Sequence, residues 1–478
     1  MTYLSIEEVH EKAKGIRNIK QKDLIERFNY SVNGNKNLMG DLFEEWFGKP
    51  KDSDSSPDLG LVELKATPFK RLKSGKISAK ERLVLNIINY ENLVNESFDS
   101  SHLIQKNKNL ELAFYEANPE VSKSEWFFQE VFSYQMQQYP ADFEIIKKDW
   151  HIIQEYVKAG KAHELSESLT DYLSACTKGA NRKSVRSQPF SDIKAKQRAF
   201  SFKSGFMTNL LRQYVFNDNS NESIIKNASE VKNKSLEELI KDKFAPYVGK
   251  SQKELQEIFE INSTSKSIRN MIVRAILGLN KNSKLDKIAE FEKASIVPKT
   301  ILVDEKNNPT EHMSFPEFNF QELVTQNWTD KNGNPEADLH NYLIESKFLF
   351  VVFKKIDKST IILKGIEFYN VPQYDLDTTI KKAWLDTKCK LQEGVQLELR
   401  GQRVHNNLIK ATDKSIIHVR PHSGLSSYQN NEYANKLPTL AKWIKTPEDN
   451  QKYTGNYMTT QSFWFNKSYI KQIISDLL

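Results

Sequence analysis

The chain of 478 residues carries 69 Lys and Arg against 62 Asp and Glu, a formal charge of +7, and this mild excess is a weak indication of a nucleic-acid partner. Its 38% hydrophobic and 27% charged residues are typical of a globular protein rather than a disordered one, and its length predicts two or three domains. Two cysteines, no apolar run of the ~18 residues that a membrane span needs and no signal-peptide pattern favour a cytoplasmic protein without disulfides or a membrane partner.

Hydrophobic periodicity predicts both helices and strands in the first part of the chain. Helices are expected over 6–29 with a break at Gly15, over 38–47 before Gly48, and over 142–158. Strands are expected over 61–67, 82–89 and 110–115. The polar residues 49–58 predict a loop before the first of these strands. Together these elements indicate an α+β or α/β fold in which helices flank a mixed sheet.

The order of short motifs repeats along the chain, which suggests a duplication. Four pairs of segments match in order: 43–48 with 273–278, 62–66 with 296–300, 147–150 with 381–384, and 200–202 with 463–465. The last pair, rich in aromatic residues, is expected to open a final amphipathic helix in each copy. We therefore predict one fold present as two domains, residues 1–216 and 241–478, joined by a polar linker over 217–240.

The excess of positive charge is concentrated in one segment. Between Cys176 and Arg212, nine basic residues stand against Asp192 alone, a net charge of +8 that exceeds the +7 of the whole chain. One interpretation is a solvated face, and the other is a strip that contacts phosphates.

The pattern Pro-Asp…Glu-x-Lys, formed by Pro57, Asp58, Glu63 and Lys65, carries the clearest chemistry. On a strand, Glu63 and Lys65 project to one face while Leu64 packs the other way, and Asp58 can reach the first face from the preceding loop. Two carboxylates suit Mg²⁺, and a lysine can orient or deprotonate a water and stabilise charge, as hydrolysis of a phosphodiester requires. The alternative is an ordinary exposed strand.

Glu44, on the helix before this motif, could supply a third carboxylate, or it could simply face solvent. Other chemistries find little support. The sequence has no phosphate-binding Gly-rich loop, no dinucleotide fingerprint, no His-Glu-x-x-His and no Gly-x-Ser-x-Gly. Cys176 is expected to be an ordinary buried thiol.

Residues 36–65 and 147–211 resemble the MutH-type nucleases, and most closely the two-domain type II restriction endonucleases that cleave at GATC. The resemblance rests on segments 62–69, 80–90 and 176–181 and spans essentially the whole chain. It implies a restriction-endonuclease-like fold in which Asp58, Glu63 and Lys65 are the catalytic triad, with Asp58 and Glu63 at the metal, Glu44 the helix carboxylate and Lys106 a second active-site lysine. For Lys106, a surface lysine is the alternative. The gap between Asp58 and Glu63 is two residues shorter than the family's, so the loop must be tighter.

The resemblance also implies DNA contacts in the N-terminal half. Lys36 falls where the smaller MutH enzymes have a DNA-contacting lysine. Where MutH enzymes carry Arg-Pro in the base-reading loop, this chain has Cys176-Thr177. The first half is therefore expected to read bases differently, through Thr177, Lys178 and Ser201.

The base-reading loop of the second copy does resemble the Arg-Pro reader of the family. Arg420 and Pro421 stand there, followed by His422. Arginine can donate two hydrogen bonds to guanine, which is the commonest specific base contact. These three residues are therefore expected to contact DNA.

The second copy has lost the catalytic motif. Val297 stands where Glu63 is expected, Arg274 stands where Glu44 is expected, and only Lys299 remains. An arginine in place of a metal carboxylate would repel Mg²⁺. We expect this half to bind DNA as an allosteric or clamp module without cutting it; the alternative is that it only stabilises the fold.

The resemblance implies a type II restriction endonuclease that makes Mg²⁺-dependent double-strand cuts in DNA at 5′-GATC-3′, before the G, leaving 5′-phosphates. A palindromic site needs two cuts, so one catalytic domain per chain implies a homodimer on DNA or two successive nicks. The functional partner would be a cognate methyltransferase in the host. The alternatives are a MutH-like repair nickase and a non-catalytic sequence-specific DNA-binding protein.

Overall fold

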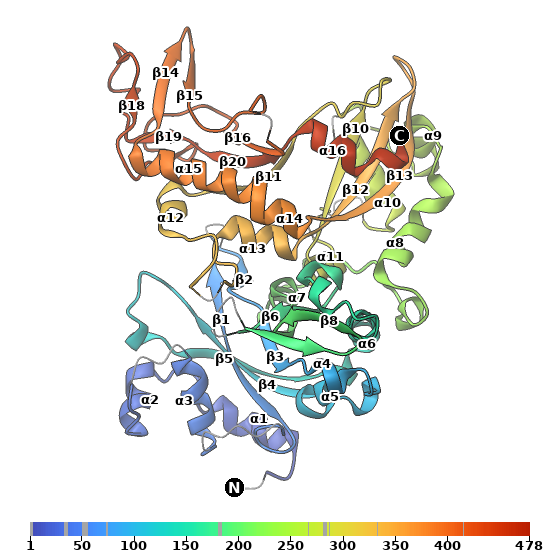
Figure 1. Cartoon of the computed structure of the whole chain (residues 1–478), viewed down its shortest axis with the longest axis vertical. Coiled ribbons are helices and arrows are strands. Elements are labelled where there is room, and N and C mark those ends of the chain that lie inside the picture. Colours follow the sequence, from blue (N-terminus) through green and yellow to red (C-terminus); the bar gives the residue numbers. More distant parts are fainter. Residues whose placement is uncertain are drawn as a thin grey trace. The chain divides into compact units, whose positions relative to one another are not determined.

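The structure is a computed structural model, shown in Figure 1, that describes residues 3–32, 37–49, 56–72, 75–179, 184–265, 267–280, 284–285, 287–331, 333–413 and 415–478. The chain forms two compact units. Unit 1 comprises residues 1–243 and 274–297, and unit 2 comprises residues 244–273 and 298–478. Within the described residues, no helix combines the length and the apolar character that crossing a membrane requires.

Unit 1 contains two sheets and a hairpin. The main sheet has the strand order β2-β1-β4-β5, formed by β1 (Glu63–Arg71), β2 (Ile77–Ala79), β4 (Asn109–Glu116) and β5 (Phe128–Gln135). It is mixed, because β1 is parallel to β4 but antiparallel to β2. The second sheet has the order β3-β9-β6, formed by β3 (Leu83–Ile87), β6 (Leu173–Thr177) and β9 (Arg198–Phe202). The hairpin consists of β7 (Val185–Gln188) and β8 (Ser191–Lys196).

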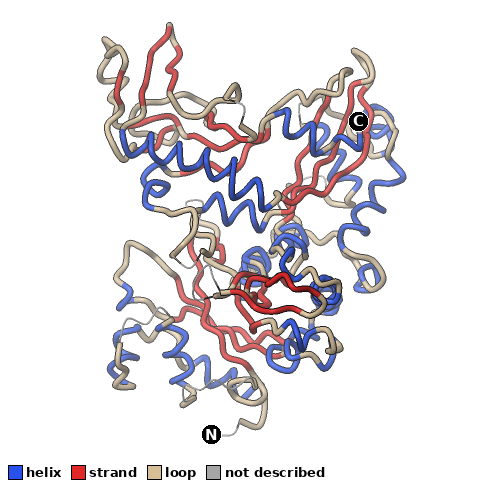
Figure 2. Tube along the Cα trace, in the orientation of Figure 1, coloured by secondary structure: helices blue, strands red, loops and turns tan. Residues whose placement is uncertain are grey.

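The helices of unit 1 are α1 (Ile6–Lys14), α2 (Gln21–Arg27), α3 (Leu38–Trp46), α4 (Tyr90–Leu93), α5 (His102–Asn107), α6 (Pro140–Lys158), α7 (Ser204–Leu210) and α11 (Ala289–Ala294) (Figure 2). The first three cover one face of the main sheet, where Val9 and Phe43 of the helices share a core with Leu64 and Ala113 of the strands. Leu64 therefore points to the helices, as predicted, which leaves Glu63 and Lys65 for the opposite face.

The predicted elements of this region are confirmed, with small shifts of their ends. Gly15 is the C-cap of α1 and separates it from α2, and Gly48 follows α3 in the left-handed conformation, with φ of +67°. The predicted strands correspond to β1, β3 and β4, and the predicted amphipathic helix corresponds to α6.

Unit 2 repeats the strand orders of unit 1. Its sheet β10-β12-β13 is formed by β10 (Ile296–Val303), β12 (Lys347–Lys355) and β13 (Ile361–Asn370), and its sheet β11-β20-β16 by β11 (Met313–Phe318), β16 (Ile417–Pro421) and β20 (Gln461–Phe465). These match β1-β4-β5 and β3-β9-β6 in chain order. In the second sheet of each unit, the central strand is antiparallel to both neighbours. The shared topology agrees with the predicted duplication.

α8 (Leu236–Phe244) belongs to unit 1 up to residue 243, and α10 (Ile268–Ile276) crosses from unit 2 into unit 1. The other helices of unit 2 are α9 (Gln252–Ile258), α12 (Phe320–Thr325), α13 (Asp338–Glu345), α14 (Gln373–Asp375), α15 (Lys381–Glu393) and α16 (Lys467–Ile473). The repeated tryptophans, Trp150 and Trp384, are buried in α6 and α15. A glycine with positive φ follows each helix, Gly160 after α6 and Gly394 after α15.

Unit 2 also has strands of its own. They are β14 (Gln396–Arg400), β15 (Arg403–Asn406), β17 (Ala434–Lys436), β18 (Lys442–Trp443) and β19 (Tyr457–Thr459). β14 and β15 form a hairpin that extends from the body of the unit, as Figures 1 and 2 show.

Two expectations about the repeats differ from the structure. The aromatic segments 200–202 and 463–465 do not open a helix; they lie in β9 and β20, the central strands of their sheets, and α7 and α16 begin two residues later. The packing boundary also differs from the predicted linker 217–240, because residues up to 243 pack with unit 1 and residues 274–297 return to it.

Candidate active site

A tight turn brings Asp58 back to the start of β1. The Leu59 amide donates to the carbonyl of Val62 at 3.1 Å, and the Gly60 amide donates to that of Pro57 at 2.9 Å. Gly60 has a φ of +74°, a conformation that glycine adopts without strain. The shortened loop between Asp58 and the strand is therefore closed by a compact turn.

This turn joins the two predicted metal-binding carboxylates. The Asp58 amide donates to Oε2 of Glu63 at 3.2 Å, while Oδ2 of Asp58 accepts from the Leu64 amide at 3.0 Å. Glu63 is only 2% exposed, whereas Asp58 is half-buried. Both carboxylates therefore lie at the beginning of β1, as the Pro-Asp…Glu-x-Lys pattern requires.

Two lysines approach the same carboxylate. The Lys65 ammonium donates to Oε1 of Glu63 at 2.6 Å, and that of Lys106 lies 3.5 Å from the same oxygen. Lys106 also donates to the carbonyl of Ser56 at 3.2 Å. The structure thus unites Asp58, Glu63, Lys65 and Lys106, although Lys106 is distant in sequence and comes from α5.

The electrostatics of this cluster favour a divalent cation. Burial, together with the charges of Asp58 and Asp41, raises the pKa of Glu44 to about 7. Burial also raises the pKa of Glu63, although Lys65 opposes this shift. A metal ion stabilises carboxylates that repel one another in a partly buried site. These carboxylates therefore fit the predicted divalent cation.

The described residues contain no larger set of metal ligands than this pair of carboxylates. Across the described ranges, no group of three or more His, Cys, Asp or Glu side chains converges closely enough to form a complete metal cage. Mg²⁺ usually keeps several waters and takes only one or two protein carboxylates. Asp58 and Glu63 are the two carboxylates that could hold such an ion.

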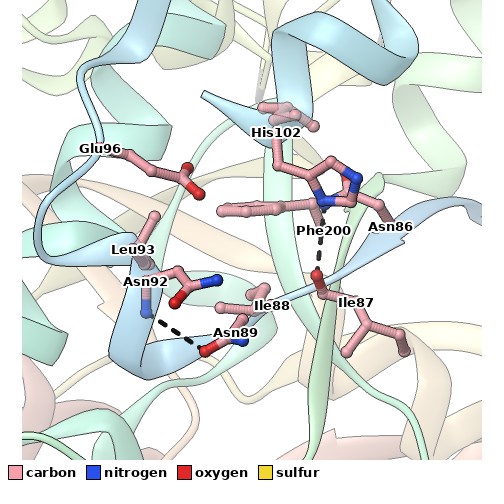
Figure 3. A pocket seen from close by; sticks show the side chains of 10 residues that line it. Asn86, Ile87, Ile88, Asn89, Asn92, Leu93, Glu96, His102 and Phe200 are labelled. Carbon is pink, nitrogen blue, oxygen red and sulfur yellow. Dashed lines mark hydrogen bonds between the residues drawn. The ribbon is translucent and has the colours of Figure 1, made fainter. Parts of the chain in front are cut away.

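Asn86 of β3, which the sequence analysis did not single out, anchors both ends of α5 and so fixes the helix that carries Lys106. The Asn107 side-chain amide donates to Oδ1 of Asn86 at 3.1 Å, and the Asn86 amide nitrogen lies 3.3 Å from Nδ1 of His102. Asn86 and His102 also line a small pocket with Phe200 of β9, shown in Figure 3. A buried asparagine in an otherwise apolar strand was the signal that could have found it.

The residues of unit 1 that are predicted to contact DNA differ in their exposure to solvent. Lys178 is exposed just after β6, and its amide donates to the carbonyl of Gln197 at 2.8 Å, while Thr177 is half-buried at the strand end. Ser201 is 0% exposed, and its hydroxyl lies 2.9 Å from that of Ser174, so it belongs to the sheet interior rather than to a DNA-facing surface. Lys36 lies outside the described residues.

The basic segment is not a uniform strip. Arg198 is buried and donates to the carbonyls of Ala175 and Leu165, while Lys203 is buried and donates to the carbonyl of Thr170. These two cations stabilise the interior. Within this segment, the basic residues that the structure describes as exposed are Lys178, Arg186, Lys194 and Lys196. Cys176 is a buried free thiol, as expected.

The second copy presents Arg420, Pro421 and His422 at the end of β16, all exposed. The Arg420 guanidinium lies 4.9 Å from the ring centre of Trp464. Pro421 pairs with Gln461 at the end of its ladder, just as Thr177 ends the ladder of β6 and β9. Arg420-Pro421 thus occupies the place that Cys176-Thr177 has in unit 1.

Two comparisons with known proteins bear on this site. Residues 47–149, which include Asp58, Glu63, Lys65 and Lys106, match the family model described as DNA mismatch repair enzyme MutH. The chain is also 47% identical over 491 aligned residues to the type II restriction enzyme Sau3AI of Staphylococcus aureus, an alignment that covers 100% of both chains. It is therefore a site-specific deoxyribonuclease, and restriction nucleases of this kind generally use a divalent metal. The chain belongs to the MutH-like family of type II restriction endonucleases.

Proposed function

We propose that this enzyme makes Mg²⁺-dependent double-strand breaks at 5′-GATC-3′, cutting before the G and leaving 5′-phosphates. The observation that carries the proposal is the cluster of Asp58, Glu63, Lys65 and Lys106. It is supported by a relative, a type II restriction enzyme, that aligns over the whole chain. The site and the cut position come from the resemblance to the GATC-cleaving nucleases.

Each side chain of the cluster has a chemical task. Asp58 and Glu63 would hold Mg²⁺, and this ion would supply stabilisation of charge on the phosphate and make a water molecule more acidic. Lys65 orients the attacking water, and Lys106 is close enough to bind an oxygen of the same phosphate. Glu44, whose charge is coupled to that of Asp58, would assist as a third carboxylate beside this pair.

The two copies divide the work of DNA binding. The catalytic copy, residues 1–216, reads bases through Thr177 and Lys178, and Lys36 is a further predicted contact. The copy at 241–478, joined through 217–240, binds DNA as an allosteric or clamp module. Its contacts are Arg420, Pro421 and His422, which are exposed at the end of one strand.

A palindromic target explains the expected assembly. The catalytic cluster occurs once in the part of the chain that the structure describes, so two cuts need two chains or two successive reactions. A homodimer on DNA satisfies this requirement. In a host, a cognate methyltransferase would protect the same sites.

The test is digestion of a mapped plasmid by the wild-type chain and by the Glu63→Ala variant, with Mg²⁺ and with or without adenine methylation. Wild type should produce linear fragments that end at GATC. The variant should lose at least about 100-fold of the cleavage rate while its gel-shift affinity for a GATC duplex stays largely intact. Cleavage by the variant at the wild-type rate would refute the metal site.

The same digestion separates the competing functions. Nicked circles without linear product would favour a repair nickase, the activity suggested by the name of the family model that matches residues 47–149. Binding without cleavage under any metal would favour a DNA-binding protein. Fragments ending at a different sequence would keep the enzyme class and change the target.

A further inference from the structure

Lys299 of β10, which aligns with Lys65, is a half-buried cation without an acidic partner. Its ammonium donates to the main-chain oxygen of Ser314 at 3.1 Å. Among the described residues, no carboxylate lies within ion-pair distance of it, and burial alone lowers its pKa. In unit 1, by contrast, Lys65 pairs with Glu63 at 2.6 Å.

A buried ammonium without a counter-charge raises the free energy of the folded state. Removing a charge from water without a counter-charge destabilises the folded state, and proteins usually pair or replace such groups. Val297 stands where unit 1 has Glu63, so the second copy has lost the carboxylate and kept the lysine. A bound anion would supply the missing charge.

The neighbouring surface of unit 2 is suited to DNA. Ser314, which accepts from Lys299, pairs with Trp464, and Trp464 pairs with His418, so these residues form one row across the sheet β11-β20-β16. The Arg420 guanidinium packs over the Trp464 ring in this row. Burial and the charges of His312 and Arg420 lower the pKa of His418 to about 4. The buried His418 is therefore neutral, and the cations that contact this row are Lys299, through Ser314, and Arg420, through Trp464.

We propose that the inactivated catalytic position of unit 2 is a binding site for a DNA backbone phosphate, with the Lys299 ammonium as its charged contact. The inference rests on the proposed DNA-binding function of unit 2 and deepens it. Phosphate contacts position a protein on DNA, whereas base contacts specify the sequence. Lys299 supplies the first kind of contact and Arg420 the second.

The test uses the full chain with Glu63→Gln, so that DNA is bound but not cut. Binding of a fluorescent GATC duplex is measured by anisotropy against salt concentration, and the number of duplexes per chain is determined. Three further changes are compared: Lys299→Gln, which keeps a donor to the Ser314 carbonyl but removes the charge, Lys299→Arg, which keeps the charge, and Lys358→Gln. Lys358 is an exposed lysine of the same unit.

The expected result is that a second duplex binds and that Arg420→Ala abolishes this binding. Lys299→Gln should lower the slope of log K against log salt for the second duplex by about one, a change of about threefold in affinity for each fourfold change in salt. Lys299→Arg and Lys358→Gln should retain the original slope.

The outcomes separate the inference from the function on which it rests. If Arg420→Ala abolishes binding of the second duplex but Lys299→Gln behaves like Lys358→Gln, the phosphate site is refuted and unit 2 still binds DNA. If one duplex binds per chain in every variant, and neither Arg420→Ala nor Lys299→Gln changes its affinity or its salt slope, the proposed function of unit 2 fails and the phosphate site fails with it.

Discussion

The position of Asp58 at the start of β1 depends on the main-chain turn between Pro57 and Val62. The motif identified the residue type and its neighbours, but the short gap to Glu63 left the path of the loop open. The path of the loop depends on main-chain hydrogen bonds within the turn, from Leu59 to Val62 and from Gly60 to Pro57. Side-chain spacing alone cannot reveal such bonds, whereas the shared face of Glu63 and Lys65 follows directly from strand geometry.

Glu111 of β4 is a buried carboxylate on which the pH dependence of stability should depend. It is 0% exposed and lies 2.9 Å from Nδ1 of His10. Burial raises its pKa from the ordinary value of 4.5 to about 6, and the bond to His10 opposes this shift. The folded state therefore holds the proton more tightly than the unfolded state, so this contribution is complete below pH 4.5 and is lost as the pH rises through 6.

The Glu111→Gln variant should remove this dependence. A shift of this size corresponds to about 2 kcal/mol, so the wild-type free energy of unfolding should fall by that amount between pH 4.5 and pH 7 relative to the variant. Urea unfolding at several pH values measures the difference. Glu91, an exposed carboxylate of the same unit, provides a Glu91→Gln control. Parallel pH curves for wild type and Glu111→Gln would contradict the assignment.

Among the elements, those with a clear hydrophobic period were predictable, whereas the central strand β9 was not. α1 to α3 and α6 each bury one stripe, and β1 alternates at its start, so sequence periodicity identified them. β9 is buried along its whole length and shows no alternation, which is why its aromatic residues were assigned to the start of a helix. The pairing of β9 with β3 and β6 depends on segments that are far apart in the chain.

The contact between α7 and α11 in unit 1 gives a prediction at this scale. Gly205 of α7 lies against α11, where an added Cβ would collide with the main-chain oxygen of Glu292. Because a backbone atom cannot move aside cheaply, Gly205→Ala should lower the free energy of unfolding by about 1–3 kcal/mol. Gly424→Ala is the matched control, since a Cβ there meets nothing within 4 Å. Equal melting temperatures for the two variants would show that α11 does not pack closely here.

At the scale of the whole chain, the duplication was predictable but the division into packing units was not. Four weakly matching segments in the same order indicated two copies, and the strand orders agree. The predicted boundary followed composition, placing the break in the Asn-rich residues 217–240. In the structure, residues 274–297 pack with unit 1, because α11 contacts α6 and α7 of that unit. Composition gives no information about such distant contacts.

This packing predicts that the N-terminal copy is unstable without α11. Lys293 pairs with Asp142 at 2.7 Å, and both side chains are largely buried, so a fragment of residues 1–216 leaves the Asp142 carboxylate without its cation. Breaking a buried ion pair from one side costs about 3–5 kcal/mol. The fragment 1–216 should therefore melt well below a chain in which residues 1–243 are joined by a Gly/Ser linker to 274–297. Calorimetry of both, with Lys293→Met in the linked chain as a control, measures the difference. The control should lower the melting temperature toward that of 1–216, whereas equal temperatures for all three would mean that the N-terminal copy is stable without this segment.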